Sequence, residues 1–105
     1  MKRVTFHGQS LKAIKRFPVE ARNEAGHQLD RLQHGLDPLD WKPMPTVGKG
    51  VREVRIRCRG QYRIMYVVNL GKEVHVLHAF RKKSQKTRKL DIEAARRSLR
   101  QLETR

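Results

Sequence analysis

Three segments in the second half of the chain have the pattern of β-strands, and only three residues separate one from the next. Residues 51–58 alternate between apolar and charged side chains, as does a strand with one buried face. Residues 62–70 are apolar at nearly every position except Arg63 and Asn69, as expected of a strand covered on both faces. Residues 74–80 form the third candidate strand. Because such short turns join antiparallel neighbours, the three segments are predicted to form an antiparallel meander.

The first third of the chain is predicted to supply one strand and two helices. Residues 4–6 form a short candidate strand. Ser10 is expected to cap a short helix, and Pro18 to interrupt it and begin a second one. Apolar residues then recur at helical spacing until Gly35, which is expected to end the second helix.

The rest of the chain is predicted to hold one irregular connection, one basic loop and a last helix. Residues 36–50 are rich in proline and glycine, so we expect a connection without regular structure, pinned by Trp41. The loop at 81–89 leads to a final helix that Thr87 is expected to cap. The predicted order is β-α-α-β-β-β-α, an α+β fold in a single domain spanning residues 1–105.

Charge is the feature of composition that most narrows function. The 105 residues contain 25 Lys and Arg against 10 Asp and Glu, a formal net charge of +15. Between Lys49 and Lys89, thirteen basic residues face two acidic ones within 41 residues. A charge gathered in this way predicts a polyanionic partner, either a nucleic acid or an acidic protein.

The same composition argues against secretion and membrane insertion. Cys58 is the only cysteine, so the chain cannot form an internal disulfide. The basic start of the sequence is not followed by the apolar run of a secretory signal. No stretch approaches the roughly 20 apolar residues that span a bilayer. We therefore expect a cytoplasmic protein with no membrane partner.

Arginines on the predicted strands are the first candidates for a site. Arg55 and Arg57 share the polar face of their strand, roughly 7 Å apart, a separation close to that of successive phosphates. A solvated outer face without a ligand is the alternative for this pair. Arg63 interrupts an otherwise apolar central strand, where an arginine is costly unless it is paired or lies at an anion site. Glu53, on a neighbouring strand, is its candidate structural partner.

The segment that follows the third strand has the densest charge. Lysines among other cations have lowered pKa values, which suits a general base near neutral pH. His78 precedes this segment and is a candidate acid or base, although a packed or solvent-facing histidine is the simpler interpretation. Phe80 and Tyr66 are candidates for stacking on RNA bases, or else core residues. The polar candidates for RNA contact here are Arg81, Lys82, Lys83, Gln85 and Lys86.

Neither the histidines nor Cys58 have a recognisable metal-ligand spacing, so no metal and no cofactor is expected.

Several motifs together resemble the phage-derived, HigB-like branch of the RelE/ParE toxin superfamily. The resemblance covers nearly the whole chain, in the right order. The Tyr-Arg strand is shared across the superfamily, whereas the His-Ala-Phe, Lys-Lys and Lys-Thr elements are more specific to this branch. The matching segments are DWKPM at 40–44, GVREVRIR at 50–57, YRIMY at 62–66, LHAFRKKSQKT at 77–87 and DIEAAR at 91–96.

The resemblance implies a RelE-like fold, a curved and mainly antiparallel sheet packed by helices. It also implies the toxin of a type II toxin–antitoxin pair, which enters the ribosomal A site, contacts 16S rRNA and cleaves mRNA there. In such a reaction the ribose 2′-hydroxyl attacks its adjacent phosphate, without a metal. The expected partner that restrains the toxin is a cognate helix-turn-helix antitoxin.

The resemblance also assigns residues. It places the strand arginine of the family at Arg63, the cations of the preceding strand at Arg55 and Arg57, and the catalytic segment at 78–86. Some relatives have a tyrosine or histidine near the last helix, and this chain has neither. Lys82 or Lys83 is then the expected base, with Arg63 or a neighbour as the acid.

Two other functions remain open from the sequence. ParE-like relatives share the fold but inhibit DNA gyrase through protein contact, and a non-catalytic phage protein that binds RNA or the ribosome would use the same basic surface. The cations at 63 and 81–86 favour RNA chemistry over gyrase inhibition.

Overall fold

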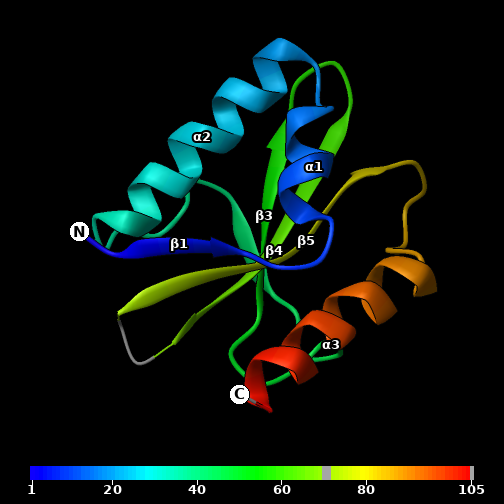
Figure 1. Ribbon diagram of the computed structural model, residues 1–105. Coiled ribbons are helices and arrows are strands. Elements are labelled where there is room, and N and C mark those ends of the chain that lie inside the picture. The colour runs from blue at the N-terminus through cyan, green and yellow to red at the C-terminus, as the bar shows by residue number, and fades with distance from the viewer. Residues whose placement is uncertain (70–71, 105) are drawn as a thin grey trace.

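The computed structural model describes residues 1–69 and 72–104, and it contains an α+β fold (Figure 1). The predicted strand end at Leu70 and the predicted turn residue Gly71 lie outside the described residues. The chain contains one more strand, β2, than the sequence predicted. The elements are β1 (Arg3–Phe6), α1 (Ser10–Lys15), α2 (Val19–Gln33), β2 (Trp41–Pro43), β3 (Arg52–Arg57), β4 (Gln61–Asn69), β5 (Glu73–Lys82) and α3 (Lys89–Glu103).

The strands form one mixed sheet in the order β1-β5-β4-β3-β2. The antiparallel meander predicted for β3, β4 and β5 is confirmed. β2 adds an antiparallel edge to β3, whereas β1 lies parallel to β5 at the opposite edge. β4 is therefore the central strand, which explains why its sequence is apolar at almost every position.

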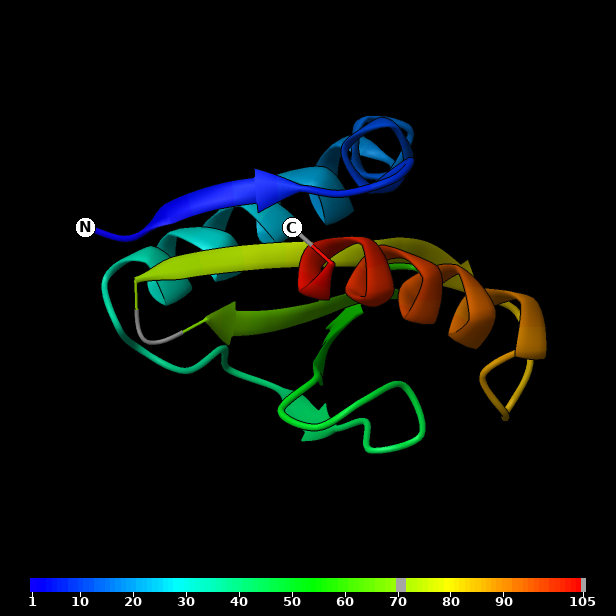
Figure 2. The same ribbon diagram turned by 60° about the horizontal axis from the view of Figure 1, so that its bottom comes forward.

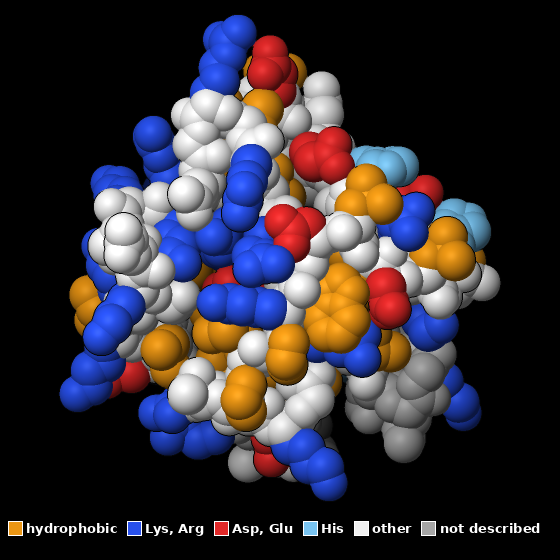
Figure 3. All heavy atoms as spheres, turned by 180° about the vertical axis from the view of Figure 1, so that it is seen from behind, with side chains coloured by type: hydrophobic (Ala, Val, Ile, Leu, Met, Phe, Trp, Pro, Cys, Tyr) orange, Lys and Arg blue, Asp and Glu red, His pale blue; other side chains and the backbone are white. Residues whose placement is uncertain are grey.

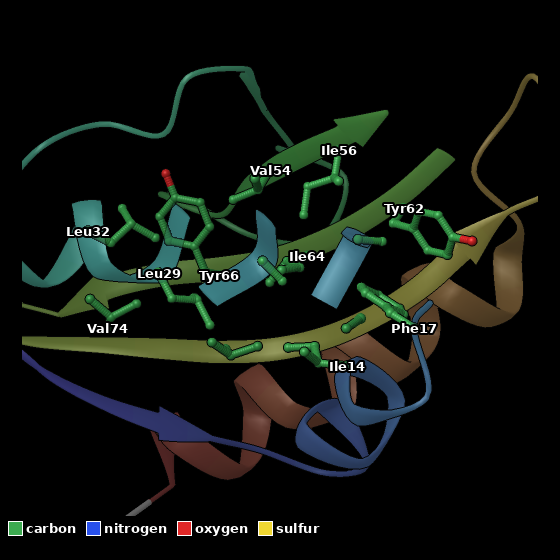
Figure 4. Close-up of a cluster of buried hydrophobic side chains, with 14 residues drawn as sticks. Ile14, Phe17, Leu29, Leu32, Val54, Ile56, Tyr62, Ile64, Tyr66 and Val74 are labelled. Carbon is green, nitrogen blue, oxygen red and sulfur yellow. The ribbon is translucent and has the colours of Figure 1, made fainter. Parts of the chain in front are cut away.

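One face of the sheet packs against α1 and α2 and holds the larger hydrophobic core (Figure 4). Val54 and Ile56 lie in this core, with Cys58 packed against it, so the predicted inward face of β3 is confirmed. Phe17 lies against the ring of Tyr62, with the two ring centres 4.7 Å apart. This layer packs against the central strands from one side.

The opposite face is covered only in part. There α3 runs along β5 (Figure 2). Together with the loop before β3 it forms a second core, to which α3 contributes the fully buried Ala95. The buried members of this core are Met44, Val47, Val51, Met65, Leu77, Phe80 and Ala95. This core ends at Phe80. Beyond Phe80, toward the end of β5, the same face of the sheet carries polar side chains.

The strand β2 corrects the prediction that residues 36–50 are irregular. Trp41 pairs with Val54, and Pro43 with Arg52. Pro43 fits here because β2 is an edge strand, where a missing N–H breaks no ladder. The guanidinium of Arg52 lies 4.1 Å from the centre of the Trp41 ring, so Trp41 does hold this connection against the sheet.

The ends of several other elements also differ from prediction. The residue capping α1 is Gln9, and Ser10 is instead buried within the helix, where its hydroxyl donates to the carbonyl oxygen of Val76. Arg88, not Thr87, precedes α3. β5 continues to Lys82, so the basic loop is shorter than expected and Arg81 and Lys82 belong to a strand.

Candidate nucleic-acid interface

An open pocket of about 550 Å³ lies on the partly covered face, where β3 and β5 end and β4 begins. Strand register creates it, because Arg55 pairs with Arg63, and Gln61 pairs with both Arg57 and Lys82. Directly paired residues project on the same face of a sheet. The residues lining the pocket are Arg55, Arg57, Gln61, Arg63, Lys82, Lys83, Ser84 and Gln85. Figure 3 shows Lys and Arg side chains gathered on one face of the molecule.

Arg63 forms the floor of this pocket, and its side chain is only 4% exposed. Its Nη2 donates to Oε1 of Gln61 over 2.9 Å, and its Nη1 donates to the carbonyl oxygen of Tyr62 over 3.3 Å. Its Nε lies 3.2 Å from Oε1 of Glu53, so the predicted partnership with Glu53 is confirmed. A central-strand arginine is thus both paired and directed at a pocket that can receive an anion.

Glu53 lies beneath the cations and is fully buried. Besides Arg63, the amine of Lys42 lies 3.9 Å from its carboxylate. Burial raises the pKa of Glu53, and the nearby cations oppose that rise only in part. The sequence placed this residue on the polar face of β3 but gave no sign that it would be enclosed.

Lys82 lies in a setting that disfavours its charged form. Burial, followed by the charges of Arg63, Lys42 and Arg55, lowers its pKa, and Glu53 offsets this in part. Burial is the largest cause, and the cations that add to it lie on neighbouring strands rather than in the basic segment itself. Lys83 lines the same pocket and is exposed.

Arg55 and Arg57 line the pocket from β3, as the sequence predicted, but their settings differ. Asp40 binds Arg55, with its Oδ1 at 2.6 Å from Nη2 and 2.8 Å from Nε. Arg57 is exposed. Arg55 therefore contributes a partly neutralised charge, and Arg57 presents its guanidinium to solvent.

Comparison with known families agrees with this arrangement of strands and cations. The family model of the phage-derived Gp49-like proteins (DUF891) matches residues 12–100. The chain belongs to the Gp49-like family. It is a family of RelE-like, toxin-related proteins. No curated protein matches the chain.

In this Gp49-like protein, two predicted site residues lie away from the pocket. Nε2 of His78 lies 2.8 Å from Oδ1 of Asp91 at the start of α3, so His78 ties β5 to that helix. Phe80 is buried in the second core, and its ring stacks on His78 with centres 5.4 Å apart. Because Phe80 is only 7% exposed, almost none of its ring surface is open for a base to stack on. Tyr66 is fully buried, in line with the core interpretation.

Two predicted RNA contacts also lie outside the pocket lining. Arg81 projects toward the other face, where its guanidinium lies 5.9 Å from the centre of the Tyr62 ring. It borders a separate groove with Arg16 and Phe17. Lys86 is exposed in the loop before α3. Adjacent strand residues alternate in direction, so Arg81 and Lys82 could not both face the pocket.

Three polar residues at this Gp49-like site escaped sequence reasoning, namely Lys42, Asp40 and Ser84. Lys42 lies on β2, and Asp40 is the residue before that strand. The nearby prolines made this segment look like a loop in the sequence. Ser84 lines the pocket from the basic loop, and nothing in the local sequence distinguishes it from a solvated loop serine. Within residues 1–69 and 72–104, no group of three His, Cys, Asp or Glu side chains could hold a metal ion, and no helix is long and apolar enough to cross a membrane.

Proposed function

We propose that this protein is a type II toxin of the HigB-like branch that cuts mRNA on the ribosome. The observation that carries the proposal is Lys82, a lysine with a lowered pKa, beside Arg63 in an open cationic pocket. A base next to fixed positive charge is what cleavage of a phosphodiester by its own ribose requires. Membership of a toxin-related phage family supports the same activity.

In the proposed reaction, neutral Lys82 removes the proton of the ribose 2′-hydroxyl. The 2′-oxygen then forms a bond to the adjacent phosphorus, and the bond from phosphorus to the 5′-oxygen breaks. A protonated amine, which we assign to Lys83, gives its proton to the leaving 5′-oxygen. The products are a 2′,3′-cyclic phosphate and a 5′-hydroxyl. No oxidant, reductant or metal enters this balance.

Arg57 and Arg63 serve the same reaction electrostatically. The phosphorane carries more negative charge than the ground-state phosphate, and guanidinium groups fixed in advance stabilise that added charge. Arg63 suits this role because three neighbours hold its orientation before RNA arrives. Gln85, in the loop, is placed to contact the nucleotide at the rim.

The proposed partners follow from the charge of the pocket. Translated mRNA in the A site is the substrate, with 16S rRNA contacting the remaining basic surface, and the site of action is the cytoplasm. A cognate antitoxin with a helix-turn-helix domain restrains the toxin by covering the pocket with acidic side chains. Co-expression of the two proteins should yield a complex that leaves mRNA intact.

Induced expression followed by primer extension on translated mRNA tests the proposal. Arg63→Lys keeps the charge beside Glu53 but removes the two-pronged donor, so cuts should fall by about 100-fold. The control is Arg97→Ala, an exposed arginine on α3, which should cut like the wild type. DNA breaks without mRNA cuts would replace the proposal with gyrase inhibition, and harmless expression of folded protein would replace it with non-catalytic binding.

A further inference from the structure

Glu53 is a fully buried acid in the most positive part of the molecule. Cations act on it from both neighbouring strands, with Lys42 on β2 and Arg63 on β4, and also from Lys82 on β5 and Arg55 on its own strand. Among the described residues, neither of its carboxylate oxygens receives a hydrogen bond. A buried ion pair is often no more stabilising than apolar side chains of the same volume, so stability alone is a poor reason for this arrangement.

The contacts of Arg63 indicate what Glu53 does. A guanidinium has five N–H donors, one on Nε and two on each terminal nitrogen. Nη1 donates one to Tyr62 and Nη2 donates one to Gln61, while Nε lies 3.2 Å from the Glu53 carboxylate in an ion pair that makes no hydrogen bond. One N–H therefore remains on each terminal nitrogen. A phosphate with two oxygens can accept from these two remaining donors.

We infer that Glu53 is a positioning residue. Its carboxylate holds the Nε side of the Arg63 guanidinium, so that the terminal nitrogens of Arg63 contact the scissile phosphate. The inference rests on the proposed function, since it names a supporting residue for that same site. Glu53 touches neither RNA nor the reacting atoms. It acts through Arg63, and through its charge on Lys82.

A positioning role has a signature that separates binding from catalysis. The negative charge of Glu53 opposes a phosphate in the pocket, so its removal should not weaken binding of RNA. The orientation of Arg63 matters most when charge develops on the phosphorane, so its loss should lower kcat. Removing Glu53 also removes a charge that favours protonated Lys82. The acidic limb of the rate profile, where Lys82 loses its proton, should move to lower pH.

The test compares Glu53→Gln with Glu103→Gln, which removes the same charge from an exposed position at the end of α3. Binding is measured with a single-stranded oligonucleotide that carries a 2′-deoxyribose at the cleavage position, and kcat with mRNA on ribosomes. We expect Glu53→Gln to bind as tightly as wild type or tighter, to lose about tenfold to a hundredfold in kcat, and to shift the acidic limb downward. Glu103→Gln should match wild type in all three.

An unchanged kcat and limb in Glu53→Gln would overturn the inference, as would equal losses in binding and kcat. Wild-type protein gives an independent readout if the variant does not fold. In NMR titrations of the Glu53 carboxyl, the bound oligonucleotide should raise its pKa further, and no change would contradict the inference. Failure of the proposed function looks different, because wild-type protein itself would then leave ribosome-bound mRNA uncut.

Discussion

Lys82 and Arg63 lie in the same pocket, yet burial has different consequences for the two side chains. An arginine keeps its proton under all conditions in which proteins fold, whereas a lysine can lose its proton when burial and nearby cations lower its pKa. The pKa of Lys82 is lowered by both causes. The pocket therefore places a lysine with a lowered pKa beside arginines, which is the combination the proposed reaction needs.

Replacement of Lys82 by arginine separates these two properties. Lys82→Arg keeps the positive charge and removes the base, so cleavage should fall by roughly 100- to 10,000-fold. Binding of the 2′-deoxy oligonucleotide should change little, because the charge that attracts phosphate remains. Gel assays of mRNA cleavage and fluorescence anisotropy measure the two effects. Cleavage at the wild-type rate would rule Lys82 out as the base.

Individual residues of the site could be predicted from the sequence to different degrees. Arg63 was recognisable because it interrupts an apolar strand, and Arg55 and Arg57 because they alternate with buried residues. Alternation shows which face a residue occupies but not what covers that face. The enclosure of Glu53, and the packing of His78 and Phe80 against α3, depend on distant elements and could not be inferred from local spacing.

Among the elements, the turn between β3 and β4 sets the register that brings the cations together. It occupies residues 58–60, one residue earlier than the predicted turn at 59–61, and the N–H of Cys58 donates to the carbonyl oxygen of Gly60 over 3.0 Å. Gly60 has a φ of 153°, a conformation that residues with a Cβ rarely adopt. An ideal Cβ there would lie 3.4 Å from the ring of Tyr62.

Two glycine substitutions with opposite effects test this account of the turn. Gly60→Ala should lower the free energy of unfolding by about 1–2 kcal/mol, because the alanine is strained at a positive φ. Gly26→Ala, in the interior of α2 with no atom within 4 Å of the new Cβ, should raise it by about 0.5–1 kcal/mol. Urea unfolding measures both values. A neutral Gly60→Ala would show that the turn carries no strain.

The two edges of the sheet were not predicted from the sequence, for the same physical reason. β2 has only three residues and ends in a proline, so its strand character comes from pairing with β3 rather than from its own pattern. The position of β1 beside β5 depends on a parallel pairing between distant parts of the chain. Local patterns determined the meander and the helices, whereas long-range pairing determined the two edges.

At the scale of the whole molecule, hydrophobic packing decides where the charge can act. α1 and α2 cover one face of the sheet, and α3 covers only part of the other. The cations of the three strand ends are thereby left to line one open pocket. A net charge of +15 attracts any polyanion, but only this pocket, among the described residues, combines a fixed arginine with a lysine of lowered pKa.

The chemistry of the RNA ends tests that claim most directly. Purified protein is added to ribosomes translating a defined mRNA, and the termini of the fragments are analysed by mass spectrometry. The account predicts 2′,3′-cyclic phosphates paired with 5′-hydroxyls, because the attacking oxygen comes from the RNA itself. Fragments with 3′-hydroxyls and 5′-phosphates, or mRNA that stays intact, would contradict it.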